Sequence, residues 1–290
     1  MKTNLIQVKQ NSIQAPVVSI IVPCYNDEKY IEETLDSILR QSFSSWECII
    51  INDGSKDTTE TLVLNKIKFD KRFNYIYQNN TGVCIARNNA IKKSIGQYIL
   101  CLDADDLISN NFLEETVNLL DLNSSLNIAT STVNFFGRSK GVLKVVSYDL
   151  DILLAANQIV MTSLFRRVDF DKVGGFNENM KDGFEDWDFW ISVLKNGGNV
   201  TCAKQAVFYY RLQNKSRNRL ISFEKEKRLR YQIWNNHKEL FSEYFVDPVK
   251  CFEYIKYADS MEYKIGSIIL NPVRKIKFWI VFLKEKFNLI

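Results

Sequence analysis

The chain has 290 residues, 46% of them hydrophobic, and a formal net charge of +4 at neutral pH. This length and composition suffice for a full hydrophobic core, in one large domain or in a domain with an appendage. Residues 1–14 lack the apolar stretch of a signal peptide, and no run approaches the ~20 apolar residues that cross a bilayer, so the sequence predicts a cytoplasmic protein.

Four short runs predict β-strands that are covered on both faces: residues 17–22, 46–51, 73–78 and 98–102. Each run is rich in β-branched or aromatic residues and is nearly continuous in apolar character, as in parallel sheets. Helical patterns separate the runs, at Ile31, Leu35 and Ile38, then over residues 58–68 and 86–94. The alternation of strand and helix predicts parallel crossovers and an α/β fold, whose ligands bind at the carboxyl ends of the strands.

Each predicted strand ends in a polar, turn-forming segment. These segments are Pro23-Cys24-Tyr25-Asn26-Asp27, Asn52-Asp53-Gly54-Ser55, Asn80-Thr81-Gly82 and Asp103-Ala104-Asp105-Asp106. Because parallel strands end at the same edge of a sheet, we expect the four segments to meet on one rim. Neither GxGxxG after the first strand nor GxxxxGK[ST] anywhere is present, so the rim is not a common dinucleotide or P-loop site.

The last of these segments places three carboxylates within four positions. Asp103 and Asp105 lie two residues apart, so an extended chain points both to the same side, and Ala104 adds no bulk between them. Close carboxylates repel each other unless a cation neutralises them. Hard oxygen ligands of this kind suit Mg²⁺ or Mn²⁺ held together with the phosphates of a substrate. A solvated acidic turn is the alternative for this motif taken alone.

A second group of acidic and aromatic residues comes later in the chain. Residues 185–195 predict a helix, which Gly197 and Gly198 end, and three carboxylates lie in its first turn. The helix macrodipole explains such carboxylates in ordinary proteins. Alternatively, the neighbouring rings would dehydrate a carboxylate and form a platform for a sugar. Further on, a strand ends at Arg211, and its polar loop either closes over a diphosphate or is an ordinary surface loop.

The cysteines and the single histidine exclude two common kinds of site. None of the six cysteines forms a CxxC pair, and five lie in or beside apolar strand-like segments, where we expect burial. His237 lies in a polar helical stretch, and we expect it to have no partner. A histidine zinc site and a Ser-His-Asp triad are therefore excluded.

The last eighty residues are helical in pattern and basic. Residues 211–290 carry 17 basic and 9 acidic side chains, against 21 and 25 in residues 1–210. Residues 272–284 mix cations with bulky apolar groups, as does a helix that lies on an anionic membrane surface. Packing on the main domain or on a second subunit is the alternative for this tail. We expect an N-terminal tail over residues 1–16, a main domain over 17–219, a helical extension over 220–290, and no nucleic-acid partner.

Eight segments together resemble, in order, the motifs of family 2 glycosyltransferases of the GT-A fold, over about residues 17–216. They are Val18-Ser19-Ile20-Ile21-Val22-Pro23-Cys24-Tyr25-Asn26, Asn52-Asp53-Gly54-Ser55, Asn80-Thr81-Gly82-Val83, Ala86-Arg87-Asn88, Leu102-Asp103-Ala104-Asp105-Asp106, Gly174-Gly175-Phe176-Asn177-Glu178, Glu185-Asp186-Trp187-Asp188, and Tyr210-Arg211 with the loop to Ser216. The resemblance implies a Rossmann-like, mostly parallel sheet with flanking helices, followed here by the helical extension.

The resemblance also implies a reaction, in which a hexosyl or N-acetylhexosaminyl group leaves a nucleotide-diphosphate donor with inversion. A UDP-sugar is the first expectation for the donor, and a glycan or lipid-linked hydroxyl in surface polysaccharide or glycoconjugate synthesis is the expected acceptor. Peripheral attachment at the inner face of the cell membrane would suit such an acceptor.

Carried over position by position, the resemblance gives each motif a role. The nucleotide pocket would be lined by Pro23, Tyr25, Asp53, Asn80 and Arg87. The DxD motif would be Asp103, Ala104 and Asp105, whose two carboxylates hold Mn²⁺ or Mg²⁺ against the diphosphate, and the diphosphate would also be held by Arg211 and Ser216. The general base would be Asp186, and the acceptor and donor-sugar pocket would be shaped by Glu185 and Trp187. Asn52 replaces a usual acidic residue of the family, and Gln213 replaces a frequent metal-binding histidine, which predicts weaker metal binding.

Two other functions fit the same fold less well. A sugar-nucleotide nucleotidyltransferase should carry a glycine-rich GxGxR-type loop after the first strand, and Pro23-Cys24-Tyr25-Asn26 is unlike it. A non-catalytic nucleotide-sugar-binding module should have lost the acidic cluster or Asp186, and both are intact. We therefore expect an active transferase.

Overall fold

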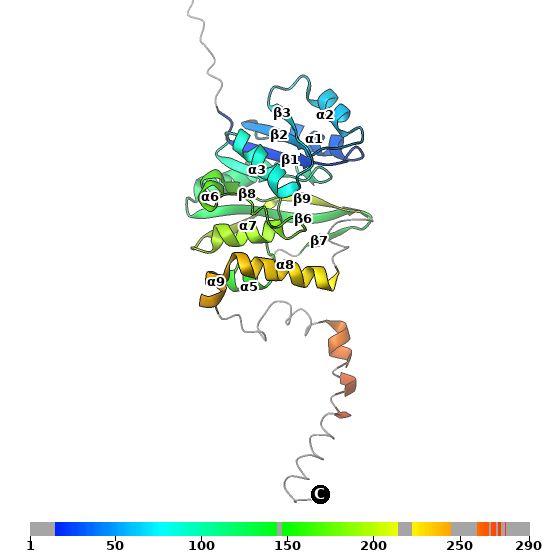
Figure 1. Ribbon diagram of the computed structural model, residues 1–290, viewed down its shortest axis with the longest axis vertical. Helices are drawn as coiled ribbons and strands as arrows, with labels where there is room; N and C mark the ends of the chain where they lie inside the picture. Colours follow the sequence, from blue (N-terminus) through cyan, green and yellow to red (C-terminus); the bar gives the residue numbers. More distant parts are fainter. Residues whose placement is uncertain are drawn as a thin grey trace, which may run out of the picture. The chain divides into compact units, whose positions relative to one another are not determined.

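The computed structural model describes residues 15–143, 147–213, 222–244, 260–266, 268–270, 272–273 and 276 (Figure 1). Its strands are β1 (Val18–Cys24), β2 (Trp46–Asn52), β3 (Phe73–Tyr77), β4 (Tyr98–Cys101), β5 (Leu107–Ile108), β6 (Leu126–Gly137), β7 (Gly141–Leu143), β8 (Leu164–Arg166) and β9 (Asn199–Leu212). Its helices include α1 (Ile31–Leu39), α2 (Thr59–Ile67), α3 (Val83–Lys93), α4 (Phe112–Leu122), α5 (Leu150–Ala155), α6 (Arg167–Val173), α7 (Glu185–Leu194), α8 (Phe223–Asn236) and α9 (Lys238–Glu243). The chain divides into two compact units, residues 1–148 with 158–238 and residues 149–157 with 239–290.

The first unit contains one sheet with the strand order β3-β2-β1-β4-β8-β6-β9-β5, and β7 pairs with β6. The β3-β2-β1-β4 half is parallel throughout. Every residue of β1 and β2 is buried, which explains the continuous apolar runs that predicted these strands. The predicted α/β fold is confirmed, and β1 continues two residues past its predicted end, so that Pro23 lies inside the strand opposite Ile51.

The other half of the sheet is mixed. β8 pairs antiparallel with both β4 and β6, β6 runs parallel to β9, and the short β5 pairs antiparallel with β9. The long β6–β9 ladder has a register shift between Ser131 and Thr132. The two halves join where β4 meets β8, so the acidic turn that follows β4 lies at the junction.

Helices flank the sheet (Figure 1). α1 buries the apolar side chains of Ile31, Leu35 and Ile38, as their spacing predicts. α3 begins at Val83, three residues before the predicted start, because the glycine-containing turn leads directly into the helix. Gly96 follows α3, where a Cβ atom would lie 2.6 Å from the main-chain nitrogen of Ser19, so only glycine fits against β1.

The second unit is smaller and its described part is helical. The Asp149 carboxylate caps α5 by accepting from the main-chain nitrogen of Ile152 at 3.1 Å. Among the described residues no helix is long and apolar enough to cross a membrane. Most of the predicted membrane-surface segment, residues 272–284, lies outside the described residues.

Candidate active site

The loops after β1 and β2 are joined to each other at the carboxyl edge of the sheet. Asn26 donates its main-chain N–H to Ser55 Oγ at 2.9 Å, and its Oδ1 accepts from the main-chain nitrogen of Lys56 at 2.8 Å. Asn26 has φ 58°, and in the described chain only one other non-glycine residue, Phe184, has a positive φ. Strained backbone of this kind concentrates at functional sites. Both residues flank the predicted pocket.

Asp53, at the end of β2, holds the loop between β3 and α3. It is only 5% exposed. Its two carboxylate oxygens accept from the main-chain nitrogens of Thr81 and Gly82, each at 2.9 Å. Gly54 next to it has φ 79°, and a Cβ atom there would lie 2.8 Å from the nitrogen of Asn80. Asp53 therefore supports the predicted nucleotide pocket by fixing its loop.

The remaining nucleotide-pocket candidates differ in exposure. Pro23 is buried within β1, whereas Asn80 is exposed. The ring of Tyr25 is 46% exposed and is thus available for stacking.

Arg87 is buried at 1% exposure and connects two of the motifs. Its guanidinium nitrogens lie 2.7 Å from Asp103 Oδ1 and 3.1 Å from Glu185 Oε1. Burial opposes its charge, but the two carboxylates outweigh burial and raise the pKa of Arg87 above its ordinary value. Its Nε has no hydrogen-bond partner among the described residues. The positive charge of Arg87 thus contacts both the acidic turn and the first residue of α7.

Asn88, the next residue of α3, holds the glycine turn that follows α6. Its Oδ1 accepts from the main-chain nitrogen of Phe176 and its Nδ2 donates to the Phe176 carbonyl, both at 2.9 Å. A Cβ atom at Gly175, which has φ 89°, would lie 2.7 Å from Asn88 Oδ1. This contact brings the two motifs together in the fold, although Asn88 and Gly175 lie 87 positions apart in the sequence.

The three carboxylates after β4 occupy different environments. The Asp103 side chain is 41% exposed, whereas Asp106 is only 2% exposed. Burial and the charge of Asp103 raise the pKa of Asp105. Burial and the charges of Asp105 and Asp103 also raise the pKa of Asp106, although Asp106 Oδ1 accepts from the main-chain nitrogen of Arg211 at 2.7 Å. Burial and mutual repulsion therefore disfavour the charged forms of Asp105 and Asp106.

Asp27 is a further acidic residue of the site to which the motif analysis gave no role. Burial raises its pKa to about 7, and the charges of Asp105 and Asp103 contribute to the shift. Its Oδ2 accepts from the main-chain nitrogen of Tyr25 at 2.8 Å. Asp27 was visible in the sequence at the end of the first strand, but its proximity to the acidic turn depends on the adjacent positions of β1 and β4 in the sheet.

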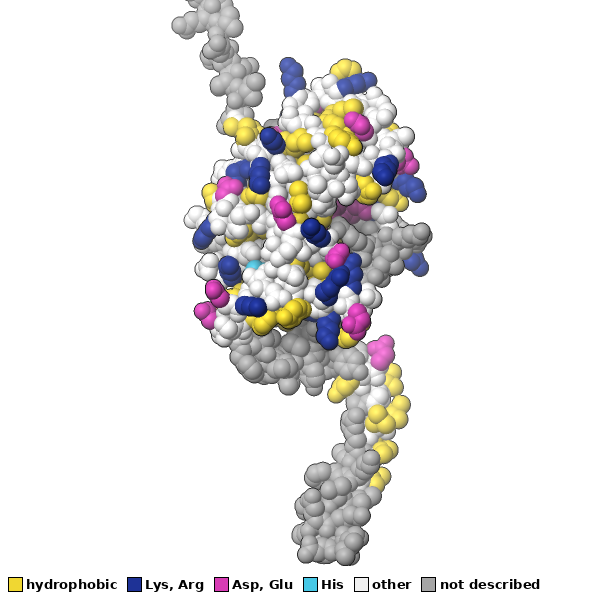
Figure 2. All heavy atoms as spheres, viewed as in Figure 1, with side chains coloured by type: hydrophobic (Ala, Val, Ile, Leu, Met, Phe, Trp, Pro, Cys, Tyr) yellow, Lys and Arg dark blue, Asp and Glu magenta, His cyan; other side chains and the backbone are white. Residues whose placement is uncertain are grey.

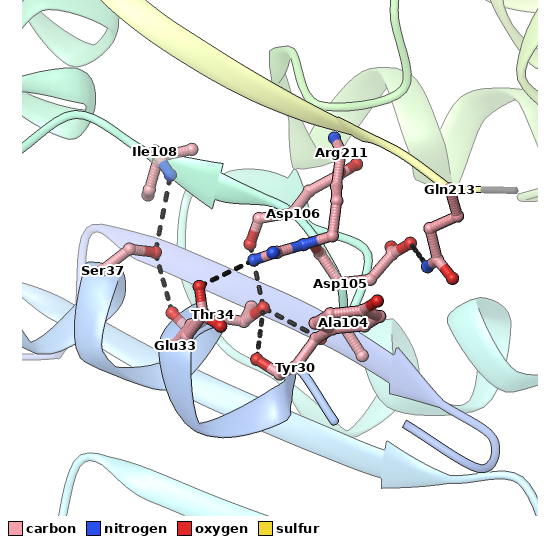
Figure 3. A network of polar contacts seen from close by, with 10 residues as sticks. All are labelled: Tyr30, Glu33, Thr34, Ser37, Ala104, Asp105, Asp106, Ile108, Arg211 and Gln213. Carbon is pink, nitrogen blue, oxygen red and sulfur yellow. Dashed lines mark hydrogen bonds and ion pairs between the residues drawn. The ribbon is translucent and has the colours of Figure 1, made fainter. Parts of the chain in front are cut away.

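The donor atoms of the acidic turn fit a hard divalent cation. Asp103 and Asp105 offer carboxylate oxygens, and Gln213 Nε2 lies 2.5 Å from Asp105 Oδ2 (Figure 3). Gln213 therefore stands beside the carboxylate pair, where its Oε1 would have to turn inward to bind a cation. Within the described chain no group of three or more His, Cys, Asp or Glu side chains forms a metal site. Asp103 and Asp105 are therefore the side chains of this turn that could hold such a cation.

Arg211 is packed against the acidic turn from the end of β9 (Figure 3). Its guanidinium lies 4.3 Å from the ring centres of Tyr30 and Phe136. Its Nε donates to the Asp105 carbonyl at 2.7 Å, and its Nη2 pairs with Glu33 at 2.8 Å. The predicted diphosphate ligand is therefore already fixed by contacts within the protein.

Thr34 of α1, the residue after Glu33, also contacts the same turn. Its hydroxyl donates to the carbonyls of Ala104 and Asp106, each at 2.9 Å (Figure 3). None of the sequence motifs contains Thr34, Tyr30, Glu33 or Phe136. The only signal for Thr34 was a polar residue at a buried position of an amphipathic helix. Ser216, the other predicted diphosphate ligand, lies outside the described residues.

The second predicted motif forms the first turn of α7. Phe184 precedes the helix with φ 59°. Asp186 is half-buried, and its Oδ1 accepts from the main-chain nitrogen of Trp187 at 2.8 Å. Trp187 is 3% exposed, with the Arg230 guanidinium 5.0 Å from its ring centre. The ring thus offers little open surface for stacking on a sugar.

The expectation that His237 has no partner is wrong. His237 is 6% exposed and its Nε2 lies 3.1 Å from Asp188 Oδ1, which also accepts from Asn236 Nδ2 at 2.7 Å. Asp188 itself is 1% exposed. The error arose because the segment looked like a polar surface helix, whereas α8 packs beside α7 and ends on its buried carboxylate (Figure 1). Of the five cysteines expected to be buried, those at positions 24, 48, 84 and 101 are buried, whereas Cys202 is only half-buried because β9 is partly exposed.

Comparisons with known proteins agree with these motifs. The model of the family described as Glycosyl transferase family 2 matches residues 19–174. TuaG of Bacillus subtilis strain 168, a glycosyltransferase assigned to teichuronic acid biosynthesis, is 29% identical over 247 residues, which cover 84% of this chain and 95% of TuaG. An uncharacterized glycosyltransferase of Haemophilus influenzae is 34% identical over 200 residues, which cover 67% of this chain and 76% of that protein.

Two solved structures share the fold. S. aureus TarS 1–349 in complex with UDP-GlcNAc aligns with a TM-score of 0.63 at 22% identity, over 76% of this chain and 66% of that one. The mannosyltransferase PcManGT from Pyrobaculum calidifontis, in complex with GDP-Man and Mn²⁺, aligns with a TM-score of 0.57 at 17% identity, over 89% and 88%. The predicted GT-A architecture is thereby confirmed.

Proposed function

This chain belongs to glycosyl transferase family 2, and from that premise we propose that it transfers a sugar with inversion from a nucleotide-diphosphate donor to an acceptor hydroxyl. The observation that carries the proposal is the link through Arg87, which holds Asp103 of the acidic turn and Glu185 of α7 on one buried guanidinium. That link supports a single site that combines the donor-binding turn with Asp186, the residue that follows Glu185 and that we propose as the general base.

We propose that the nucleotide binds at the loops after β1, β2 and β3. The exposed ring of Tyr25 would stack on the base, and the loop that Asp53 fixes would contact the nucleoside. A UDP-sugar is the first donor to test. TarS is described with UDP-GlcNAc and with UDP, whereas PcManGT is described with GDP-Man, so GDP-sugars belong in the same panel.

Asp103 and Asp105 would hold the divalent cation, Mn²⁺ or Mg²⁺, and the donor phosphates would complete its coordination. When bound, the cation supplies positive charge against the leaving diphosphate. The pKa of Asp105 is raised by burial and by Asp103, so positive charge at this position would relieve an existing repulsion. The Arg211 side chain, 10% exposed beside the same turn, would add a fixed positive charge close to the phosphates.

The acceptor hydroxyl would lose its proton to the Asp186 carboxylate while its oxygen attacks the anomeric carbon. The bond from that carbon to the diphosphate oxygen breaks on the opposite face, and the electron pair leaves with the nucleoside diphosphate. A positioned carboxylate of this kind contributes typically 10²–10⁴ in rate. Asp186 lies in the first turn of α7 and accepts from a main-chain N–H, which orients one of its oxygens.

We propose that the acceptor is a glycan or lipid-linked hydroxyl in surface polysaccharide or glycoconjugate synthesis. The assignment of TuaG to teichuronic acid biosynthesis supports this class of pathway. A cytoplasmic enzyme that attaches peripherally to the inner face of the membrane through residues 272–284 would reach a lipid-linked acceptor.

A panel of UDP-, GDP- and dTDP-sugars with Mn²⁺ or Mg²⁺ tests the function. We expect slow metal-dependent hydrolysis of one donor, which Asp103→Asn abolishes, while Asp186→Asn binds that donor without turning it over. Binding of a donor without turnover by the wild type, even with acceptor glycans present, would contradict transfer and favour the non-catalytic binding module.

A further inference from the structure

One face of α8 carries three exposed aromatic rings. Phe223 is 77% exposed, Tyr231 is 62% exposed and Trp234 is 42% exposed. Tyr231 and Trp234 stack with their ring centres 5.6 Å apart and their planes 19° apart. The other face of α8 packs on the core through Leu229, which is 4% exposed, and Ile233, which is 2% exposed. The three exposed rings are therefore not needed to hold α8 on the core.

Two lysines lie beside the three rings. At 100° per residue, positions 223, 227, 231 and 234 of α8 fall within an arc of about 80°, and Lys238 is the first residue of α9, which follows the end of α8. Lys227 and Lys238 are exposed, and Lys238 Nζ lies 5.1 Å from the ring centre of Trp234. We call these five residues the α8 stripe: Phe223, Lys227, Tyr231, Trp234 and Lys238.

The surroundings of the stripe are also cationic. Residues 223–238, from the start of α8 to the first residue of α9, carry five basic side chains against two acidic ones. Figure 2 shows Lys and Arg side chains gathered beside hydrophobic ones over α8. Two arginines are already paired, Arg228 with Asp182 at 2.6 Å and Arg230 with Glu226 at 3.1 Å. The two lysines of the stripe thus provide its attraction for an anionic partner.

We propose that the α8 stripe docks on an anionic phospholipid membrane. Tyr and Trp rings settle at the headgroup level, where one end of the ring is apolar and the other is wet, and lysines are drawn to anionic lipid. Phe223 has no hydrogen-bonding group for a sugar or a nucleotide, and its exposure suits the boundary of the acyl chains. The stripe lies within the first unit of the chain, so this contact is separate from residues 272–284 and goes beyond the proposed transfer reaction.

Vesicle flotation of the full-length protein tests the proposal. The test variant is Lys227→Gln with Lys238→Gln, and the matched control is Lys92→Gln with Lys93→Gln, which removes the same charge from exposed positions of α3. We expect binding to phosphatidylcholine vesicles with about 30% phosphatidylglycerol and little binding to pure phosphatidylcholine. The test variant should lose roughly tenfold or more in partition coefficient, and the control should lose much less.

A second measurement tests whether the Trp234 ring contacts the membrane. Brominated lipid should quench the fluorescence of the wild type on anionic vesicles more than that of Trp234→Phe. An Arg274→Gln, Lys275→Gln, Lys277→Gln variant should keep the dependence on Lys227 and Lys238. Hydrolysis of the donor without vesicles should be unchanged in the stripe variant, so a failure of the proposed transferase activity would be seen separately.

Equal partition of the stripe variant and the α3 control would overturn the proposal, as would wild-type protein that fails to float with anionic vesicles. Binding to dextran sulfate that depends on the same lysines, without vesicle binding, would assign the stripe to an anionic glycan and would also overturn it.

Discussion

Asp53 and the acidic turn lie at the same edge of the sheet, but the protein balances their charges differently. Asp53 accepts from two main-chain N–H groups and from the Gln78 side-chain amide, so its oxygens have hydrogen-bond partners within the fold. Asp105 and Asp27 instead have raised pKa values, because they are buried and lie close to further carboxylates. The first carboxylate serves the structure of the loop, and we propose that a positive ligand completes the second group. A motif containing aspartates therefore does not by itself reveal which role each has.

Neutralising a carboxylate of the acidic turn should separate activity from stability most strongly. We expect Asp105→Asn to lower donor turnover by about 10²–10³, in the range of electrostatic groups that contact developing charge. The free energy of unfolding at pH 8 without metal should stay constant or rise, since the substitution removes a repulsion. Donor hydrolysis and urea denaturation of the same preparation measure both. A parallel loss of stability and activity would show that Asp105 is a structural residue.

The corresponding substitution at Asp53 should lower the stability of the protein. Asp53→Asn leaves one main-chain N–H opposite an amide N–H₂ group, and we expect the free energy of unfolding to fall by about 1–3 kcal/mol. Donor affinity should decrease because the loop at Gly82 loosens. Urea denaturation checks the loss, and Asn74→Asp at an exposed position of β3 serves as a control for surface charge. Unchanged stability would contradict the structural role.

The parallel strands and the acidic pair were predictable from sequence, whereas the mixed half of the sheet was not. β1 and β2 are continuous apolar runs, but β9 is half-buried without regular alternation and β8 has three residues. The Asp103–Asp105 pair is a local motif. The bond between Arg87 and Glu185 joins residues 98 apart, and the approach of Asp27 depends on the order of the strands, so neither leaves a local signal.

The pH dependence of the free energy of unfolding should also distinguish the carboxylates of Asp27 and Asp57. Burial and neighbouring charges raise the pKa of Asp27 to about 7, so its contribution to stability is present below about pH 4 and is lost as the pH rises through 7. We expect Asp27→Asn to raise the free energy of unfolding at pH 8 by about 1 kcal/mol, roughly 2–4 °C in Tm, and to have little effect at pH 4.

Asp57 on the neighbouring loop is the matched control. Burial raises its pKa, but hydrogen bonds from Thr59 outweigh burial, so the net pKa is lowered. Its contribution is present above its unfolded pKa and is lost as the pH falls. Asp57→Asn should therefore lower the Tm at pH 8. If both variants shift the Tm in the same direction, the assignment of the unbalanced charge to Asp27 is wrong.

The smallest expected effect concerns Gln213, which lies beside Asp105 at the position where the family often carries histidine. Gln213→His should strengthen Mn²⁺ binding several-fold in the presence of nucleotide, because an imidazole nitrogen would coordinate the cation, whereas the Gln213 amide donates its Nε2–H to Asp105. Gln213→Leu, which has no donor atom, should weaken it slightly. Titration of Mn²⁺ by electron paramagnetic resonance measures free metal directly. Identical affinities in the two variants would place Gln213 outside the metal shell.

Calorimetric titration of nucleoside diphosphates with and without Mn²⁺ tests most directly whether the unbalanced carboxylates are completed by a cation and a diphosphate. UDP, GDP and dTDP are titrated at pH 7.5 into the wild type and into Asp105→Asn. We predict that one nucleotide binds the wild type at least tenfold more tightly with Mn²⁺, and that Asp105→Asn loses this gain. Equal affinity with and without Mn²⁺ in the wild type would contradict the account.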